Sequence, residues 1–204
     1  MIGLVSDYKN YPSNAEIEAL LNIWNGMIEK LDITKIHEEM DREIGSKRII
    51  TMSDKNILPY TNAVINEIQR MANLLPMNLP HETRRAVKID KWNIPAHTGI
   101  IAQISNVLYD SQVFPSPLTF DPCRFIDGDG KMKKIEELVP FSIGKRQCLG
   151  EGLARMELFL FISNLLNQFE LSCVDESNPP SMKKSFGTTV QPHPYRCRIK
   201  SRFN

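Results

Sequence analysis

Apolar positions in the first part of the chain recur at helical spacing in three stretches. Residues 14–31 begin at Asn14, which suits a helix N-cap, and residues 32–45 end at Gly45, which suits a C-cap. The third stretch, 60–74, opens after Pro59, and two Leu-Pro pairs follow it. The pattern therefore predicts three amphipathic helices.

The periodicity changes in the rest of the chain. Short alternating runs separated by turn residues over 83–103 predict strands in a hairpin or small sheet. Proline and glycine over 114–134 predict a long ordered loop, a kind that is usually functional. Residues 149–168 predict a helix that is apolar on most faces and therefore buried, and 171–203 reads as strands and loops. The predicted fold class is mainly α with a small β component.

Composition narrows the classes of protein. With 204 residues, 42% hydrophobic and 24% charged, the chain suits a globular protein with one substantial core or two small ones. A net charge of +1 predicts no nucleic-acid partner. The most apolar stretch, 158–166, is far shorter than the ~20 residues of a bilayer helix, and no signal peptide is recognisable. The four cysteines form no C-x-x-C pair, which argues against a zinc site or a disulfide scaffold and favours a reducing environment.

The candidate chemistry centres on Cys148, where a glycine-bearing loop enters a helix. Unpaired backbone N–H groups at a helix N-terminus stabilise a thiolate, which is a metal ligand. Gly144 permits a tight bend and Gly150 leaves clearance beside a flat ligand, while Arg146 is placed to meet an anionic group of that ligand. The alternative for a cysteine is a buried, inert side chain. We expect that alternative for Cys123, Cys173 and Cys197.

Residues 141–150 match the pattern F-x-x-G-x-R-x-C-x-G at all five specified positions. This loop resembles the haem-thiolate loop of the cytochrome P-450 superfamily. The resemblance implies haem b as the cofactor, with Cys148 as the ligand of its iron. It also implies a cofactor-binding loop that includes Phe141, Gly144, Arg146 and Gly150.

A second motif, E-x-x-R, places Glu67 and Arg70 three residues apart on one face of the third predicted helix. Taken alone, such a pair is as readily a surface ion pair worth tenths of a kcal/mol. In the family that the chain resembles, this motif joins the arginine of a later P-x-R-F segment, which is Arg124 here. The resemblance implies a buried triad that holds the 114–134 loop under the haem loop. The glutamate usual before that arginine is replaced by Cys123.

The amino-acid sequence of residues 58–70 and 75–81 is similar to that of the microsomal, drug-metabolising, family 2-like branch of the superfamily. By that resemblance His81, together with Arg146, contacts the haem propionates; a solvated loop histidine is the alternative for His81. The resemblance also implies a small apolar substrate and a partner reductase that supplies electrons from NADPH. It further implies that the protein is located at the cytosolic face of the endoplasmic reticulum membrane. The residues it implies on the substrate side are Met77, Asn78 and Leu79.

The resemblance runs from residue 33 to the C-terminus, so we expect 1–32 to be a divergent helical start and 33–204 the haem-binding C-terminal part of the P-450 fold. Family members are much longer. Their oxygen-handling helix carries an acid and a threonine, and Ile28 stands where the acid is expected. We therefore expect no catalytic acid or alcohol, no membrane anchor and no N-terminal half in this chain, with a cytoplasmic location as the alternative to the membrane.

Two hypotheses follow. The first is a haem-thiolate monooxygenase that inserts one oxygen atom from O₂ into a small apolar substrate, with turnover impaired by truncation. The second is a truncated, non-catalytic remnant that binds haem or is haem-free. A cluster of lysines predicts a basic patch for the reductase, or else a solvated run; its members are Lys131, Lys133, Lys134 and Lys145.

Overall fold

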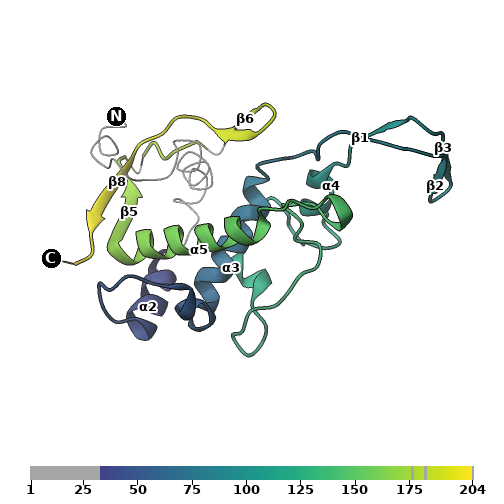
Figure 1. Cartoon of the computed structure of the whole chain (residues 1–204). Helices are drawn as coiled ribbons and strands as arrows, with labels where there is room; N and C mark the ends of the chain where they lie inside the picture. The colour runs from purple at the N-terminus through teal and green to yellow at the C-terminus, as the bar shows by residue number, and fades with distance from the viewer. Residues whose placement is uncertain (1–32, 176, 182, 204) are drawn as a thin grey trace.

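Three helices form the centre of the described part of the chain. The computed structural model describes residues 33–175, 177–181 and 183–203. Figure 1 shows α5 crossing α3, with α2 beside them. The helices expected at 32–45, 60–74 and 149–168 are confirmed, and the one expected at 14–31 lies outside the described residues. The bounds are α2 Ile33–Glu43, α3 Pro59–Ala72 and α5 Glu151–Gln168.

Short helical turns connect these helices, and the sequence pattern did not predict them. They are too short to show a period, so tertiary contacts decide them. Their bounds are η1 Met52–Ile57, α4 Ile104–Leu108, η2 Pro122–Phe125 and η3 Gly144–Arg146.

The strands of the described residues form two-stranded antiparallel sheets. The sheet expected within 83–103 is confirmed, and Figure 1 shows it as an arm that projects away from the helices. Trp92 on this arm is 63% exposed. The pairs are β1 His81–Glu82 with β4 Gly99–Ile100, β2 Val87–Ile89 with β3 Trp92–Ile94, β5 Phe169–Cys173 with β8 Cys197–Ser201, and β6 Lys184–Phe186 with β7 Val190–Pro192.

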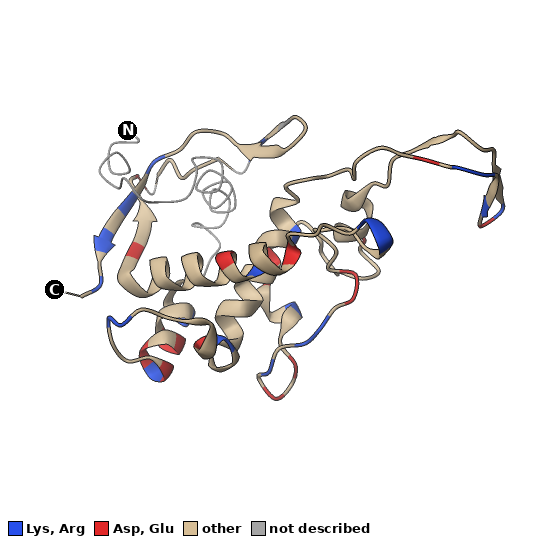
Figure 2. Cartoon of the chain, viewed as in Figure 1, with Lys and Arg blue, Asp and Glu red and all other residues tan. Residues whose placement is uncertain are grey.

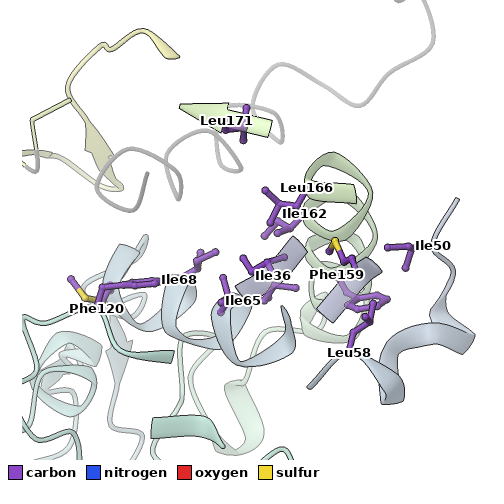
Figure 3. Close-up of a cluster of buried hydrophobic side chains, with 13 residues drawn as sticks. Ile36, Ile50, Leu58, Ile65, Ile68, Phe120, Phe159, Ile162, Leu166 and Leu171 are labelled. Carbon is purple, nitrogen blue, oxygen red and sulfur yellow. The ribbon is translucent and has the colours of Figure 1, made fainter. Parts of the chain in front are cut away.

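The main core lies where the three long helices meet. Figure 3 shows Ile36 of α2, Ile65 of α3 and Ile162 of α5 within one cluster of buried side chains. Phe120, from the long loop, extends this cluster past the end of α3, while Phe125 packs with Phe114 in a second, smaller one. The core therefore ties the loop to α3.

Helix α5 is buried on one side only, which corrects the expectation of a helix buried on most faces. Phe159, Ile162 and Leu166 are buried, whereas Leu149 just before the helix is fully exposed and Leu153 is 56% exposed. The physical reason is that no other part of the described chain packs over this side of the helix. An apolar surface is thus left open at the start of α5.

Glu39 of α2 caps the N-terminus of α3 from a distance. Its buried carboxylate accepts hydrogen bonds from the backbone N–H groups of Tyr60 (2.7 Å) and Thr61 (2.8 Å) and from the Thr61 hydroxyl (2.7 Å). The N-cap residue, Leu58, has no side chain that caps. Glu39 therefore satisfies donors that α3 cannot satisfy itself.

Replacing Glu39 by alanine is expected to lower the free energy of unfolding by about 2 kcal/mol, because buried N–H groups lose their acceptor. Urea unfolding followed by circular dichroism measures the change. Glu38→Ala is the matched control, since Glu38 is the exposed neighbour on the same helix. Equal stabilities of the two variants would contradict the capping role.

Among the described residues, no helix is both long and apolar enough to cross a membrane.

Candidate functional site

The loop before α5 presents Cys148 to the surface. The Cys148 N–H donates to the Phe141 carbonyl (3.1 Å), which closes the loop, and the Cys148 carbonyl accepts from the N–H of Glu151, the first residue of α5. Gly144 has a φ of +82°, and a Cβ there would meet no heavy atom within 4 Å. The structure thus places an exposed thiol at the N-terminal end of α5 on a loop that glycine allows to bend.

The surroundings of this thiol fit a flat, apolar group that carries its own metal ligands. Leu149, Leu153 and Ile143 are exposed around the loop, and a Cβ on Gly150 would lie 3.8 Å from the Cys148 Sγ. No three His, Cys, Asp or Glu side chains gather as a metal site in the part of the chain that is described. A single soft thiolate suits iron whose remaining ligands come from a macrocycle.

Charged side chains brace the loop against the first turn of α5. Arg155 bonds Glu151 (2.7 Å) and lies over the Phe141 ring, 5.2 Å from its centroid. Burial raises the pKa of Glu151, but hydrogen bonds from Arg155 and Gln147 outweigh it, so the net pKa is lowered. Arg146, in contrast, is exposed, two residues before the cysteine in the sequence. The sequence analysis missed Glu151 and Arg155, although their i,i+4 spacing is a signal for such a pair.

The structure brings Glu67, Arg70 and Arg124 together. The Arg70 guanidinium binds both carboxylate oxygens of Glu67, at 2.7 and 2.8 Å, and both side chains are fully buried. Arg124 reaches Glu67 from η2 at 3.2 Å, and the Asp121 N–H donates to the same carboxylate at 3.0 Å. The pair is therefore buried, and the surface alternative does not hold.

The two arginines also hold the irregular chain around them. Arg70 donates to the carbonyls of Leu108 (2.9 Å) and Pro117 (2.8 Å), and Arg124 donates to that of Pro115 (3.2 Å). Carbonyls of an irregular segment need such donors because no regular ladder satisfies them. The loop from 114 onward is thereby attached to α3.

The segment after α3 is joined to the cysteine loop by Asn78. Its side-chain amide donates to the Ser142 hydroxyl (2.8 Å), and its backbone N–H donates to the Ala102 carbonyl (2.8 Å). Met77 and Leu79 on either side are exposed. His81 is half-buried in β1, opposite Ile100, and within the described residues it forms no hydrogen bond with the cysteine loop. The structure thus connects Asn78, but not His81, to the cysteine loop.

The structure corrects the expectation that Cys123 is a buried, inert side chain. Cys123 is exposed rather than buried, because Pro122 and Phe125 are the residues of η2 that turn inward.

A cavity of about 370 Å³ lies at η1, the start of α3 and the loop after η2. None of the predicted cofactor residues lines it; Lys55, Asn62 and Lys131 are among those that do.

Comparison with known proteins gives consistent matches. The family model described as Cytochrome P450 matches residues 27–199. Cytochrome P450 2C4 of Oryctolagus cuniculus is 49% identical over 142 residues, which are 70% of this chain and 29% of that protein. Cytochrome P450 2C44 of Mus musculus is 45% identical over 169 residues, 82% of this chain and 34% of that protein.

Cytochrome P450 2D26 of Mus musculus is 46% identical over 166 residues, which are 81% of this chain and 33% of that protein. The chain spans about a third of the length of these curated relatives. The matched range includes both the cysteine loop and the Glu67–Arg70–Arg124 triad. The chain therefore belongs to the cytochrome P450 family, on its family 2-like branch.

Proposed function

We propose that this chain is the haem-binding portion of a haem-thiolate monooxygenase. The enzyme would insert one oxygen atom from O₂ into a small apolar substrate, with electrons drawn from NADPH by a reductase. The observation that carries the proposal is the exposed Cys148 thiol at the N-terminal end of α5, surrounded by glycines and open apolar side chains.

Each site residue has a role that its chemistry supports. The Cys148 thiolate would hold the iron of a haem, and the bound haem would supply the oxygen chemistry, which electron donation from a thiolate favours. Arg146 and His81 bind the propionates, and Gly144 and Gly150 keep the loop close to the macrocycle. Phe141 closes the loop through its carbonyl, which accepts from the Cys148 N–H, and the Arg155 guanidinium lies over its ring.

The substrate side is assigned to the segment after α3. Met77 and Leu79 present exposed apolar side chains that suit an apolar substrate, and Asn78 fixes their backbone to the cysteine loop through Ser142. The hydrogen bond from Asn78 to Ser142 positions this segment against the cysteine loop. Membership of the family supports a location at the cytosolic face of the endoplasmic reticulum membrane.

A second candidate function is haem binding without productive turnover. It is favoured by the open apolar surface at the start of α5, where Leu149 and Leu153 are uncovered. Water that reaches a reactive site diverts electrons into side reactions, and a closed site prevents this. Under this function the reductase would oxidise NADPH, its two electrons, with two protons, would convert O₂ to hydrogen peroxide, and no oxygenated product would form.

The test begins with the purified full chain, haem, a reductant and carbon monoxide. A long-wavelength Soret band shows thiolate ligation and supports both candidates, whereas failure to bind haem overturns both. Adding a reductase, NADPH and an apolar test substrate then separates them. Coupled product supports the monooxygenase, and NADPH consumption with peroxide alone supports the second candidate.

The basic surface for the reductase differs from the single patch that the sequence predicted. Figure 2 shows the basic loop after η2 and the basic turn at η3 at separate places. Segment 127–137 carries four carboxylates against three lysines, and Lys134 is paired with Glu136 at 2.7 Å. We therefore assign reductase docking to the turn that carries Lys145, beside the cysteine.

Reversing the charge with Lys145→Glu is expected to slow association with an acidic reductase about tenfold at low salt, because electrostatic steering is lost. Stopped-flow or surface plasmon resonance at several ionic strengths measures the rate. Lys134→Glu makes the same change of charge in the loop after η2 and is the control; it is expected to change the rate little, because that loop lies at a separate place from the turn that carries Lys145. A Lys145→Glu rate equal to that of the unmodified chain would contradict the assignment.

A further inference from the structure

Strands β5 and β8 place two cysteines directly opposite each other. Cys173 and Cys197 are Cα partners in the antiparallel register, although 23 residues separate them in the sequence. Both are free thiols and half-buried. Opposite residues in antiparallel strands have Cα atoms about 4.5 or 5.5 Å apart, and a disulfide needs roughly 4.4–6.8 Å. The register therefore meets the backbone requirement of a disulfide.

We propose that Cys173 and Cys197 form a redox-active dithiol, a modification site that closes into a disulfide between β5 and β8. The pair lies in the β5–β8 sheet, at the opposite end of α5 from the cysteine loop (Figure 1). Cys123 lies in η2 and Cys148 in the loop before α5, so neither faces another cysteine across a strand pair. The pairing is thus particular to the end of the chain.

The surroundings of the pair are compatible with this chemistry. Side chains two residues apart on a strand share a face, so the pair lies on the same face as Leu171, which is buried in the main core. Burial raises the pKa of the Cys197 thiol, and the neighbouring Cys173 raises it further. Two thiolates side by side are therefore disfavoured. One thiolate beside one neutral thiol is the state from which oxidation starts.

Hydrogen peroxide is the oxidant for which the reaction balances. One thiolate attacks the peroxide, so that an S–O bond forms, the O–O bond breaks and one water leaves after protonation. The second thiol then attacks the sulfenic sulfur; the S–S bond forms, the S–O bond breaks and a second water leaves. The two thiols lose two electrons and the peroxide gains them.

The disulfide would tie the strand that follows α5 to the last strand of the chain. Closing the loop between residues 173 and 197 restricts the unfolded chain, so we expect Tm to rise by about 5 °C on oxidation. Dithiothreitol is expected to reverse the rise.

The experiment uses the reduced full chain, treated with limiting hydrogen peroxide and then with N-ethylmaleimide. Thiols that react with maleimide are expected to fall by half, and non-reducing peptide mapping is expected to find Cys173 linked to Cys197. Cys123→Ser should keep this link and Cys173→Ser should lose it. Maleimide on both Cys173 and Cys197 after oxidation, or a link to another cysteine instead, would overturn the proposal.

A second measurement needs neither an oxidant nor a variant. Phenylarsine oxide bridges two adjacent thiols as two As–S bonds form and one water leaves. On the reduced full chain it is expected to protect Cys173 and Cys197 together from maleimide, while Cys123 still reacts. Full labelling of both residues in the presence of the arsenical would show that the thiols are not adjacent.

Discussion

Replacing Cys148 by serine is expected to abolish the thiolate-type haem spectrum and to weaken haem binding by more than about tenfold. An alcohol does not ionise at neutral pH and gives iron far less charge than a thiolate. The residue lies on an exposed loop, so its loss leaves the helical core in place. The measurement is the Soret position of the reduced, carbon monoxide-bound chain after haem is added.

Two further variants separate loss of the ligand from loss of the fold. Cys123→Ser changes an exposed cysteine in η2 and is expected to keep the thiolate band. Cys148→His offers a nitrogen ligand at the same place and is expected to bind haem with a shorter-wavelength band. A thiolate band that persists in Cys148→Ser would show that another cysteine holds the iron.

The second large effect is expected at Glu67, where alanine should lower the free energy of unfolding by about 3–5 kcal/mol. The substitution leaves Arg70 buried without its carboxylate and removes the partner of Arg124. The Asp121 N–H loses its acceptor as well. Because both arginines hold the loop from 114 onward, we expect that loop to loosen first. Urea unfolding and limited proteolysis measure the two effects.

The matched control is Glu136→Ala, which removes a carboxylate from an exposed pair with Lys134. Such surface pairs are worth about 0–1 kcal/mol, so little change is expected. Glu67→Gln keeps the size of the side chain and one acceptor oxygen but replaces the other oxygen by an amide donor and removes the charge, so an intermediate loss of stability is expected. Similar stabilities of Glu67→Ala and Glu136→Ala would mean that the triad adds nothing to the fold.

The local sequence pattern alone was enough to predict the long described helices and the cysteine loop. Apolar spacing predicted α2, α3 and α5 because each buries a stripe that repeats within its own sequence. The motif around Cys148 predicted a thiol just before a helix because the glycines and the helix start are neighbours in sequence. The Glu67–Arg70 pair was also readable, since three residues of helix bring the two side chains to one face.

Only the tertiary structure decided the contacts between distant segments. Nothing in the sequence distinguishes Glu39 from other charged helix residues. Its capping role follows from the packing of α2 beside the start of α3. The Asn78–Ser142 hydrogen bond joins two loops with no shared period.

The sequence by itself determined which of the long described segments are helical, which loop presents a thiol and which helix carries a local ion pair. The tertiary structure decided that this pair is buried, that one side of α5 stays open at Leu149, and that Cys173 faces Cys197. The physical reason is the separation along the sequence of the residues that interact. Helix formation depends on residues three and four apart, whereas burial and strand register depend on what packs from elsewhere in the chain.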